Sequence, residues 1–474
     1  MSASTNPSAP ASTRHRPIPG PARPYAFPAF ERARLENDLS VLVAPVTKLP
    51  LVTVTALIEA GCVCDPPGRY GLAQLTARLL LEGTTVSDGA DLAERFEHLG
   101  ASVEAHADWD VAAITMTVMS DQLTAAFEIF AEMLHLPAFP TREVARLKDE
   151  RQAELLQIRA EPRGLAEEVF LRHVYEPTSR FAHPEGGDDT SVGAITRHDV
   201  TEFYATRAVP ESTTLIFAGD IAPEAAFRLV RRNFGDWSGP SPSRASTGDA
   251  PASGSRAVII APKAGAPQSE LRIGHVGLPR SHPDYFAVVV MNSVLGGLFN
   301  SRINLNLREA HAYTYGAFSS FDWRRQAGPF VVSTAVRTDA TPAAIREVFS
   351  EIDRIRAEAI GDDELSLATS YLSGVFPIRF ETTAAIAAAL SSLVVYRLPS
   401  EYFDTYRNRV MAVTAADVLA AAQTHLHPER MQTVAVGDPS EIRAPLEALG
   451  FGPVVEDNGA AAHARLGTIS PPVA

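Results

Sequence analysis

Histidine, cysteine and carboxylate side chains are the groups in this chain that could bind a metal or transfer protons. The sequence contains 13 histidines and 2 cysteines. His425 and His427 form the one close histidine pair, and no carboxylate follows at the spacing of a zinc site. Cys62 and Cys64 lie two residues apart on what we predict to be one strand, and a single cysteine pair is a weak metal signal. These patterns indicate surface or hydrogen-bonded histidines, so we assign no metal to the chain.

The composition excludes several classes of protein. A chain of 474 residues is long enough for two or three domains, at roughly 150 residues each. It is 46% hydrophobic and 21% charged, and no run reaches the roughly 18 consecutive apolar residues that a membrane span needs. The net charge of −14 removes the general attraction to nucleic acid. We therefore expect neither a membrane nor a nucleic acid as partner, and we expect a cytoplasmic location.

The sequence repeats one order of elements twice. In the first half, Thr196 with Asp199 three residues on predicts the start of a helix, followed by a strand that ends at Gly219. In the second half Thr414 begins the same pattern, and the strand ends at Gly437 after the same separation. Such a conserved spacing indicates that one unit of about 200 residues is duplicated.

A segment rich in Gly, Pro, Ser and Ala divides the chain near its middle. Within each half, helices come in runs rather than alternating with strands, which favours an α+β fold. We expect two tandem homologous domains, each a mostly antiparallel sheet with helices packed on one face. The predicted boundaries are a disordered tail over 1–24, a first domain over 25–238, a linker over 239–256, a second domain over 257–455 and a tail over 456–474.

Several separated motifs resemble the pitrilysin/insulinase family of zinc peptidases, the inverzincins. They lie at residues 61–74, 81–84, 234–237 and 296–309, and they occur in the order of the family across about residues 35–450. The resemblance implies two homologous α+β domains that form a half-shell. It also implies that two half-shells close around a chamber of peptide size.

The motif that carries catalysis in that family is altered here. The family needs H-x-x-E-H on a helix, with two zinc-binding histidines, a glutamate that activates water, and a distal glutamate as third protein ligand. The matching positions are Gln74, Ala77 and Arg78, and Gln157 falls where the distal glutamate would be. An amide is a poor ligand, alanine is no base, and a guanidinium cannot shed its proton to bind zinc. We therefore expect a degenerate zinc site, with the three helix positions opposite a buried leucine stripe.

The second half retains polar groups that the resemblance connects with substrate. Arg308 and Tyr315 match an arginine and a tyrosine that, in the family, face the zinc across the chamber and donate hydrogen bonds to the peptide. Donors near the scissile carbonyl stabilise the oxyanion that forms on attack by water. Tyr313 is a competing hydroxyl, because a two-residue period would place it on the same strand face as Tyr315. The alternative is structural, with an arginine at a helix C-terminus and a half-buried strand tyrosine.

These features predict the non-catalytic subunit of a heterodimeric zinc metallopeptidase. The partner would be a homologous chain with an intact H-x-x-E-H motif that holds the zinc. Our chain would bind no cofactor, would lack peptidase activity alone, and would close the chamber around a peptide substrate. Two alternatives stay open, namely an inert scaffold of a larger complex and an autonomous enzyme with a nonstandard site.

Overall fold

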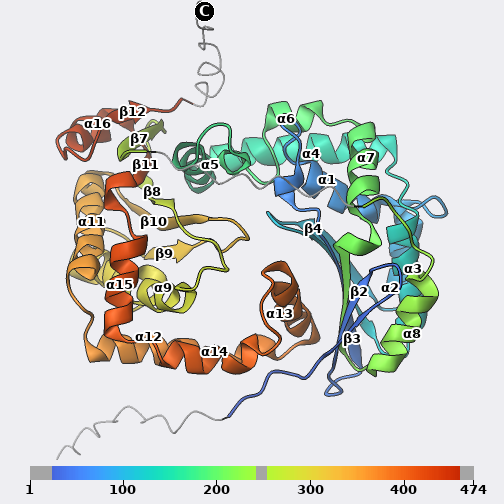
Figure 1. The fold of residues 1–474 in the computed structure, drawn as a ribbon. Coiled ribbons are helices and arrows are strands. Elements are labelled where there is room, and N and C mark those ends of the chain that lie inside the picture. The colour runs from blue at the N-terminus through green and yellow to red at the C-terminus, as the bar shows by residue number, and fades with distance from the viewer. Residues whose placement is uncertain (1–23, 242–253, 459–474) are drawn as a thin grey trace, which may run out of the picture.

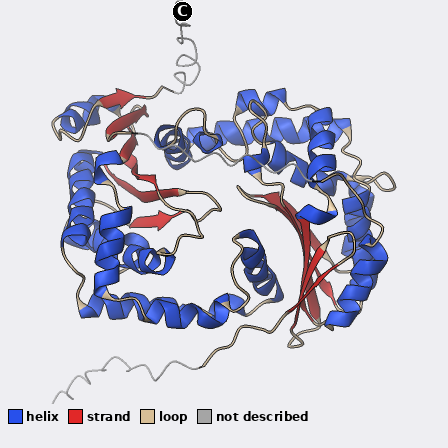
Figure 2. Ribbon diagram, viewed as in Figure 1, coloured by secondary structure: helices blue, strands red, loops and turns tan. Residues whose placement is uncertain are grey.

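The computed structural model describes residues 24–241 and 254–458, and it places two α+β units of the same plan side by side (Figures 1 and 2). Most of both predicted tails and most of the predicted linker, at 1–23, 242–253 and 459–474, lie outside the described residues. The strands of the first unit are β1 Glu31–Arg34, β2 Ser40–Pro45, β3 Leu51–Ile58, β4 Ser102–Ala107, β5 Ala112–Met119 and β6 Thr213–Gly219. Its helices are η1 Cys62–Cys64, α1 Leu72–Leu79, η2 Leu80–Glu82, α2 Gly89–His98, α3 Leu123–His135, α4 Thr141–Ala160, α5 Pro162–Val174, η3 Arg180–Ala182, α6 Asp189–Ala194, α7 Arg197–Arg207, η4 Pro210–Ser212 and α8 Pro223–Phe234.

The second unit follows a similar order of elements, but within the described residues it has no strand before β7 that would correspond to β1, and it adds β12 after its last helix. Its strands are β7 Ala257–Pro262, β8 Gln268–Val276, β9 Ala317–Phe321, β10 Pro329–Arg337, β11 Gln432–Gly437 and β12 Val454–Glu456. Its helices are α9 Tyr285–Asn292, η5 Ser293–Gly297, α10 Arg302–Asn304, η6 Leu305–Ala310, η7 Thr338–Ala340, α11 Thr341–Ala357, α12 Asp362–Val375, η8 Pro377–Phe380, α13 Thr383–Val395, α14 Tyr402–Met411, α15 Ala415–His425, η9 Pro428–Arg430 and α16 Pro439–Glu447.

The two sheets confirm the predicted duplication. Their strand orders are β1-β2-β6-β3-β5-β4 and β12-β7-β11-β8-β10-β9, so five strands occupy equivalent places, and only the edge strands β1 and β12 differ in chain position and direction. All neighbours pair antiparallel except β2 with β6, β7 with β11 and β12 with β7, as expected for a mostly antiparallel sheet. The two predicted helix starts are also confirmed. Thr196 and Thr414 each form a capping box with the aspartate three residues on, before α7 and α15.

One helix of each unit covers the sheet of the other unit. Helix α5 packs on β8 and β11, and α13 packs on β3 and β6. The Phe170 ring of α5 lies so close to Gly274 of β8 that a Cβ there would meet it at 3.0 Å. In the other direction, the hydroxyls of Thr53 on β3 and Thr383 on α13 are 2.8 Å apart. Each sheet therefore has most of its own unit's helices on one face, as predicted. A helix of the other unit covers the second face of the sheet.

This exchange explains why the central strands are apolar on both faces. Strand β6 is buried at every position, and so is β11. A strand that faced water on one side would alternate apolar with polar residues. Both hydrophobic core clusters contain residues from both units, so each of the two cores is shared between the units.

The loop between β9 and β10 joins the two units at a second place. The Arg324 guanidinium lies 4.2 Å from the ring centre of Trp109 and 5.0 Å from that of Phe181, both in the first unit. The Tyr175 hydroxyl donates a hydrogen bond to the carbonyl oxygen of Ala327 at 3.0 Å. The attraction between a cation and an aromatic ring is stronger when both are buried than when they are in water, so this contact helps to hold the two units together.

The fold extends slightly beyond the predicted second domain. Residue 456 was placed in the C-terminal tail, but Glu456 ends strand β12. Asp457 is buried and accepts hydrogen bonds from Arg172 at 3.0 Å, with His173 at 2.9 Å. These contacts between α5 and the end of the chain place both residues in the packed structure.

One helical run among the described residues, Tyr285–Ala310, is long and apolar enough to cross a membrane by length and composition alone. In the fold this run comprises α9, η5, α10 and η6. Many of its apolar side chains, among them Val288, Met291, Ile303 and Leu307, are buried in the second core cluster, while Phe299 and Leu305 are exposed. Packing against the second sheet therefore accounts for its hydrophobicity.

Candidate functional site

A buried carboxylate sets the position of α1, the helix that carries Gln74, Ala77 and Arg78. Asp65 accepts hydrogen bonds from the backbone N–H groups of Gly71 and Ala73, both at 2.8 Å, and from Arg180 at 3.0 Å. Burial raises the pKa of Asp65, and Arg180 with the two amides opposes that rise. Gly71 adopts φ 95°, and a Cβ there would lie 2.5 Å from the carbonyl oxygen of Gly186. The start of α1 thus requires glycine.

The two cysteines lie just before this helix. They were predicted on one strand, but they occupy the short helical turn η1, which bends the chain from β3 towards α1. Burial raises the pKa of the Cys62 thiol, so it stays protonated, and Cys64 is partly buried.

Gln74 and Arg78 share the half-buried side of α1, opposite the buried Leu72, Leu75 and Leu79. The Gln74 amide donates to the carbonyl oxygen of Ala107 at the end of β4, at 3.3 Å. Arg78 extends to α4, where its guanidinium contacts Glu150 at 2.5 Å and Glu154 at 3.4 Å. Arg78 therefore joins α1 to α4 by two ion pairs.

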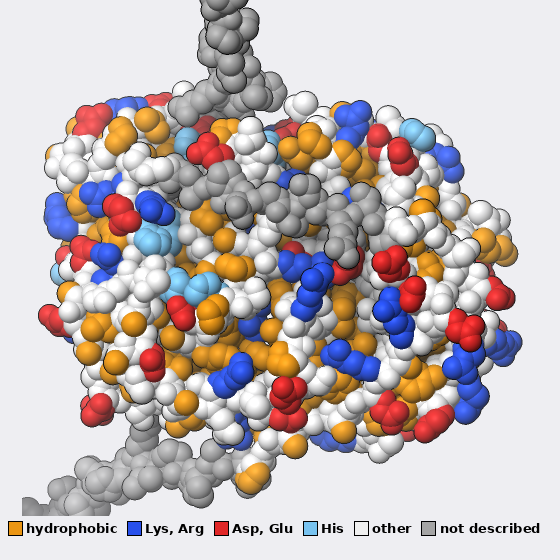
Figure 3. Space-filling view, viewed as in Figure 1, with side chains coloured by type: hydrophobic (Ala, Val, Ile, Leu, Met, Phe, Trp, Pro, Cys, Tyr) orange, Lys and Arg blue, Asp and Glu red, His pale blue; other side chains and the backbone are white. Residues whose placement is uncertain are grey.

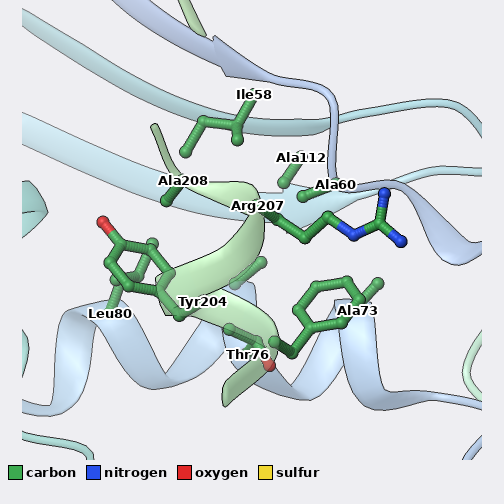
Figure 4. A pocket seen from close by; sticks show the side chains of 11 residues that line it. Ile58, Ala60, Ala73, Thr76, Leu80, Ala112, Tyr204, Arg207 and Ala208 are labelled. Atoms are coloured by element: carbon green, nitrogen blue, oxygen red, sulfur yellow. The ribbon is translucent and has the colours of Figure 1, made fainter. Parts of the chain in front are cut away.

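Ala77 lies about one turn from Gln74 and away from the leucine stripe, but it differs from Gln74 and Arg78 in its burial. It is buried and lines a cavity of about 10 Å³ between α1, α7 and the sheet. Figure 4 shows this space bounded by Thr76 and Leu80 of α1 and by Tyr204 of α7. A cavity of this size holds about one water molecule at most, so it is no substrate pocket. Alanine fits here because α7 packs directly against α1.

The position of Gln157 also needs correction. Gln157 is exposed near the end of α4, whereas Glu154 is the residue that contacts Arg78. Glu150 and Glu154 are one turn apart and so share the side of α4 that faces α1. Glu154, not Gln157, therefore lies at the distal position of the degenerate site. The acidic pair at i and i+4 on a helix was the signal that could have found it.

The residues at this site do not fit a zinc ion. Gln74 offers an amide, and Arg78 places a permanent positive charge between the carboxylates of Glu150 and Glu154. Arg151 adds a second guanidinium, which contacts Glu154 at 3.2 Å and the carbonyl oxygen of Gly186 at 3.1 Å. Two guanidinium groups already balance two carboxylates, so the charge that a cation would supply comes from side chains.

Restoring the ligands should restore metal binding. The double variant Gln74→His, Arg78→His is expected to retain one more equivalent of zinc after dialysis than the unaltered chain, because Glu154 completes the ligand set. Metal analysis of the dialysed proteins measures this. Adding Glu154→Gln should abolish the gain, while adding Gln157→Ala should not. The reverse pattern would restore Gln157 as the distal position.

Glu185, beside this site, has a perturbed carboxyl group. Burial raises its pKa to about 7, Arg324 opposes the rise, and Asp108 and Asp322 add to it. Its side chain therefore carries a proton more readily in the folded chain than in the unfolded one. Sequence inspection gives no sign of this, because the residues around Glu185 come from distant segments.

Replacing Glu185 by glutamine should reveal the cost of that charge. The raised pKa means that the stabilising effect of the protonated group is full below about pH 4.5, the unfolded value, and is lost as the pH rises to about 7. The difference in unfolding free energy between the Glu185→Gln variant and the unaltered chain should grow by about 1 to 3 kcal/mol, in favour of the variant, as the pH is raised from 4.5 to 8. Denaturant unfolding at both pH values measures it. The exposed Glu211→Gln serves as control, and an equal gain there would refute the assignment.

Arg308 and Tyr315 lie in the second unit, on η6 and in the loop before β9. The Arg308 guanidinium lies 4.7 Å from the ring centre of Phe299 and 3.3 Å from the Glu309 carboxylate. The side chain of Tyr315 is 92% exposed. No hydrogen bond or ion pair joins the two within the described parts of the chain, so any shared action requires a ligand between them.

Tyr313 does not share a strand face with Tyr315, because both residues precede β9 and adopt loop conformations. The Tyr313 ring stacks on His311 with a centroid distance of 5.0 Å and packs against the second core cluster. Its backbone carbonyl accepts a hydrogen bond from Arg337 at 3.2 Å. Tyr315 is therefore the more accessible of the two hydroxyls.

Comparison with known families gives the framework for this site. Residues 41–185 match the family described as Insulinase (Peptidase family M16), and residues 194–372 match the one described as Peptidase M16 inactive domain. The chain belongs to the insulinase family, peptidase family M16. The first match contains α1, α4 and the altered zinc positions, and the second contains Arg308 and Tyr315. The predicted resemblance is thereby confirmed.

Several relatives share most of the length of this insulinase-family chain. An uncharacterized zinc protease of Streptomyces coelicolor is 22% identical over 84% of this chain and 88% of its own. A probable mitochondrial-processing peptidase subunit beta of Schizosaccharomyces pombe is 25% identical over 57% of this chain and 60% of its own. The crystal structure of a peptidase M16 inactive domain from Pseudomonas fluorescens has a TM-score of 0.81 at 26% identity, covering 86% and 98% of the two chains.

A protease from Helicobacter pylori shares the fold with a TM-score of 0.80 at 17% identity, and the match covers 86% of this chain and 100% of that one. These relatives confirm an insulinase-family architecture of two tandem α+β domains.

Proposed function

We propose that this chain is the non-catalytic subunit of a heterodimeric zinc peptidase of the insulinase family. Its partner is a homologous chain with an intact H-x-x-E-H motif, which holds the zinc. The chain closes one side of the chamber and supplies Arg308 and Tyr315 as hydrogen-bond donors to the bound peptide.

The observation that carries this proposal is the position of Arg78. Its guanidinium lies between α1 and α4, at a position that resembles a zinc-binding histidine of the family, and it is paired with Glu150 and Glu154. Ala77 supplies no base, so the site can neither bind zinc nor activate water. A fold that keeps the architecture of a peptidase without its chemistry fits a subunit that assists another active site.

Two further features support contact with a peptide. Strand β4 is an edge strand, and its end contacts Gln74 of α1. An edge strand offers unpaired N–H and C=O groups to which an extended peptide can pair. The exposed Tyr315 offers a hydroxyl, and Arg308 offers donors in addition to its pair with Glu309. One of the related proteins is itself named a peptidase subunit.

Isolation of the chain from its native source, with whatever copurifies, tests the proposal. The expected result is a complex that hydrolyses peptides with a zinc held at the H-x-x-E-H motif of the other chain, while our chain alone does not. A stable complex whose partner also lacks H-x-x-E-H would favour the scaffold function instead. Zinc-dependent hydrolysis by the isolated chain would refute both.

A further inference from the structure

Three side chains from two distant segments converge on the second unit, away from α1 and α4. His282 and Asp284 precede α9, and Asp284 is its N-cap residue. His425 ends α15, the helix that packs beside α9. A nitrogen of each imidazole and an oxygen of the carboxylate all lie within 4.8 Å of one another. Figure 3 shows histidine side chains gathered at the surface of this unit.

The contacts among these groups are those of a preformed ligand set. His425 Nε2 lies 2.8 Å from Asp284 Oδ2, and His282 Nδ1 lies 3.9 Å from the same oxygen. The two imidazole rings meet edge to face, with centroids 4.8 Å apart. The backbone N–H of Asp284 donates to His282 Nδ1 at 3.2 Å, so this nitrogen is unprotonated, and a metal bound there would replace that hydrogen bond. An ion pair between His425 and Asp284 would need no second imidazole, so the nearby ring of His282 suggests that the three groups act together.

The separations are close to those that a small cation imposes. Ligands about 2.0 Å from a tetrahedral centre lie roughly 3.3 Å apart, which falls between the 2.8 Å and 3.9 Å seen here. The side chains would have to draw closer to reach that spacing, because the three ligand atoms lie within 4.8 Å of one another. The exposed fractions also suit a site open to solvent, since the side chain of His425 is 11% exposed, that of His282 31% and that of Asp284 47%.

We propose that His282, Asp284 and His425 bind a divalent transition-metal cation, with zinc as the favoured ion. Two imidazoles and one carboxylate are ligands that zinc accepts, whereas Mg²⁺ and Ca²⁺ prefer sites made of oxygen alone. The fourth position faces water. The bound ion links the segment before α9 to the end of α15, so it stabilises the folded second unit by closing a long loop. This site is independent of the proposed subunit function.

Zinc titration of the untagged full-length chain tests this site. We expect one equivalent to bind and the thermal unfolding midpoint to rise with added zinc. In the double variant His282→Ala, His425→Ala, the affinity for zinc should fall by at least about 100-fold. Loss of a single residue that only supports a ligand can already cost about that much, and this variant removes two ligands. The shift in midpoint should disappear with it. Cobalt should give the visible absorption of a low-coordinate site in the unaltered chain and lose it in the variant.

The matched control is His198→Ala. His198 lies 3.6 Å from Glu202 on α7, so it is a histidine with a carboxylate neighbour but no third ligand, and its loss should leave zinc binding unchanged. Mg²⁺ should produce no shift. Zinc binding that survives in the double variant, or no binding by the unaltered chain, would overturn the proposal and leave His425 and Asp284 as an ion pair. Circular dichroism of the variants shows whether they fold.

Discussion

Replacing Arg308 by alanine and Tyr315 by phenylalanine together is expected to lower kcat/KM of the peptidase complex by about 100-fold or more. The reason is electrostatic. Donors placed near the scissile carbonyl stabilise the negative charge that develops on its oxygen, and this stabilisation is present in the transition state and weaker in the bound substrate. Steady-state hydrolysis of a peptide by the purified complex measures the change, and kcat should fall more than KM rises.

Tyr313→Phe provides the matched control for this experiment. It removes the same hydroxyl from a ring that stacks on His311 and packs against the core, rather than from an exposed one. Its effect on kcat/KM should be less than about threefold, because the Tyr315 hydroxyl remains. Full activity in the Arg308 and Tyr315 double variant would show that the two residues have no catalytic role. A large loss in the control alone would assign the role to Tyr313.

Replacing Phe170 by alanine is expected to destabilise the whole chain by about 3 to 5 kcal/mol, the usual cost of removing a buried phenylalanine ring. Phe170 is fully buried on α5, between its own unit and strand β8 of the other. Because each of the two cores is shared between the units, both units should unfold in a single transition that shifts as a whole. Denaturant unfolding followed by circular dichroism and tryptophan fluorescence measures the shift.

The control for packing is Phe318→Ala on β9, where the ring is 53% exposed. Its cost should stay within about 0.5 kcal/mol, as for most surface changes. If Phe170→Ala instead split the unfolding into two transitions, with one unchanged, the two units would be separately stable domains. The sharing of the two cores would then contribute little to stability.

The sequence alone predicted the features that depend on residue type and local spacing. The capping boxes at Thr196 and Thr414 follow from a hydroxyl and a carboxylate three residues apart, and the duplication follows from equal spacing. The loss of the zinc ligands at Gln74 and Arg78 is likewise a statement about side-chain chemistry. The capping boxes and the duplication are confirmed, because each rests on groups that are neighbours along the chain or on spacing.

Only the tertiary structure decided which distant residues meet. The contact of Arg78 with Glu154, the burial of Ala77 by α7, and the convergence of His282 on His425 join segments far apart in the sequence. The exchange of α5 and α13 between sheets is of the same kind. Hydrophobic packing is not directional. An apolar strand face such as that of β6 therefore predicts that some element covers it, but it does not predict which helix.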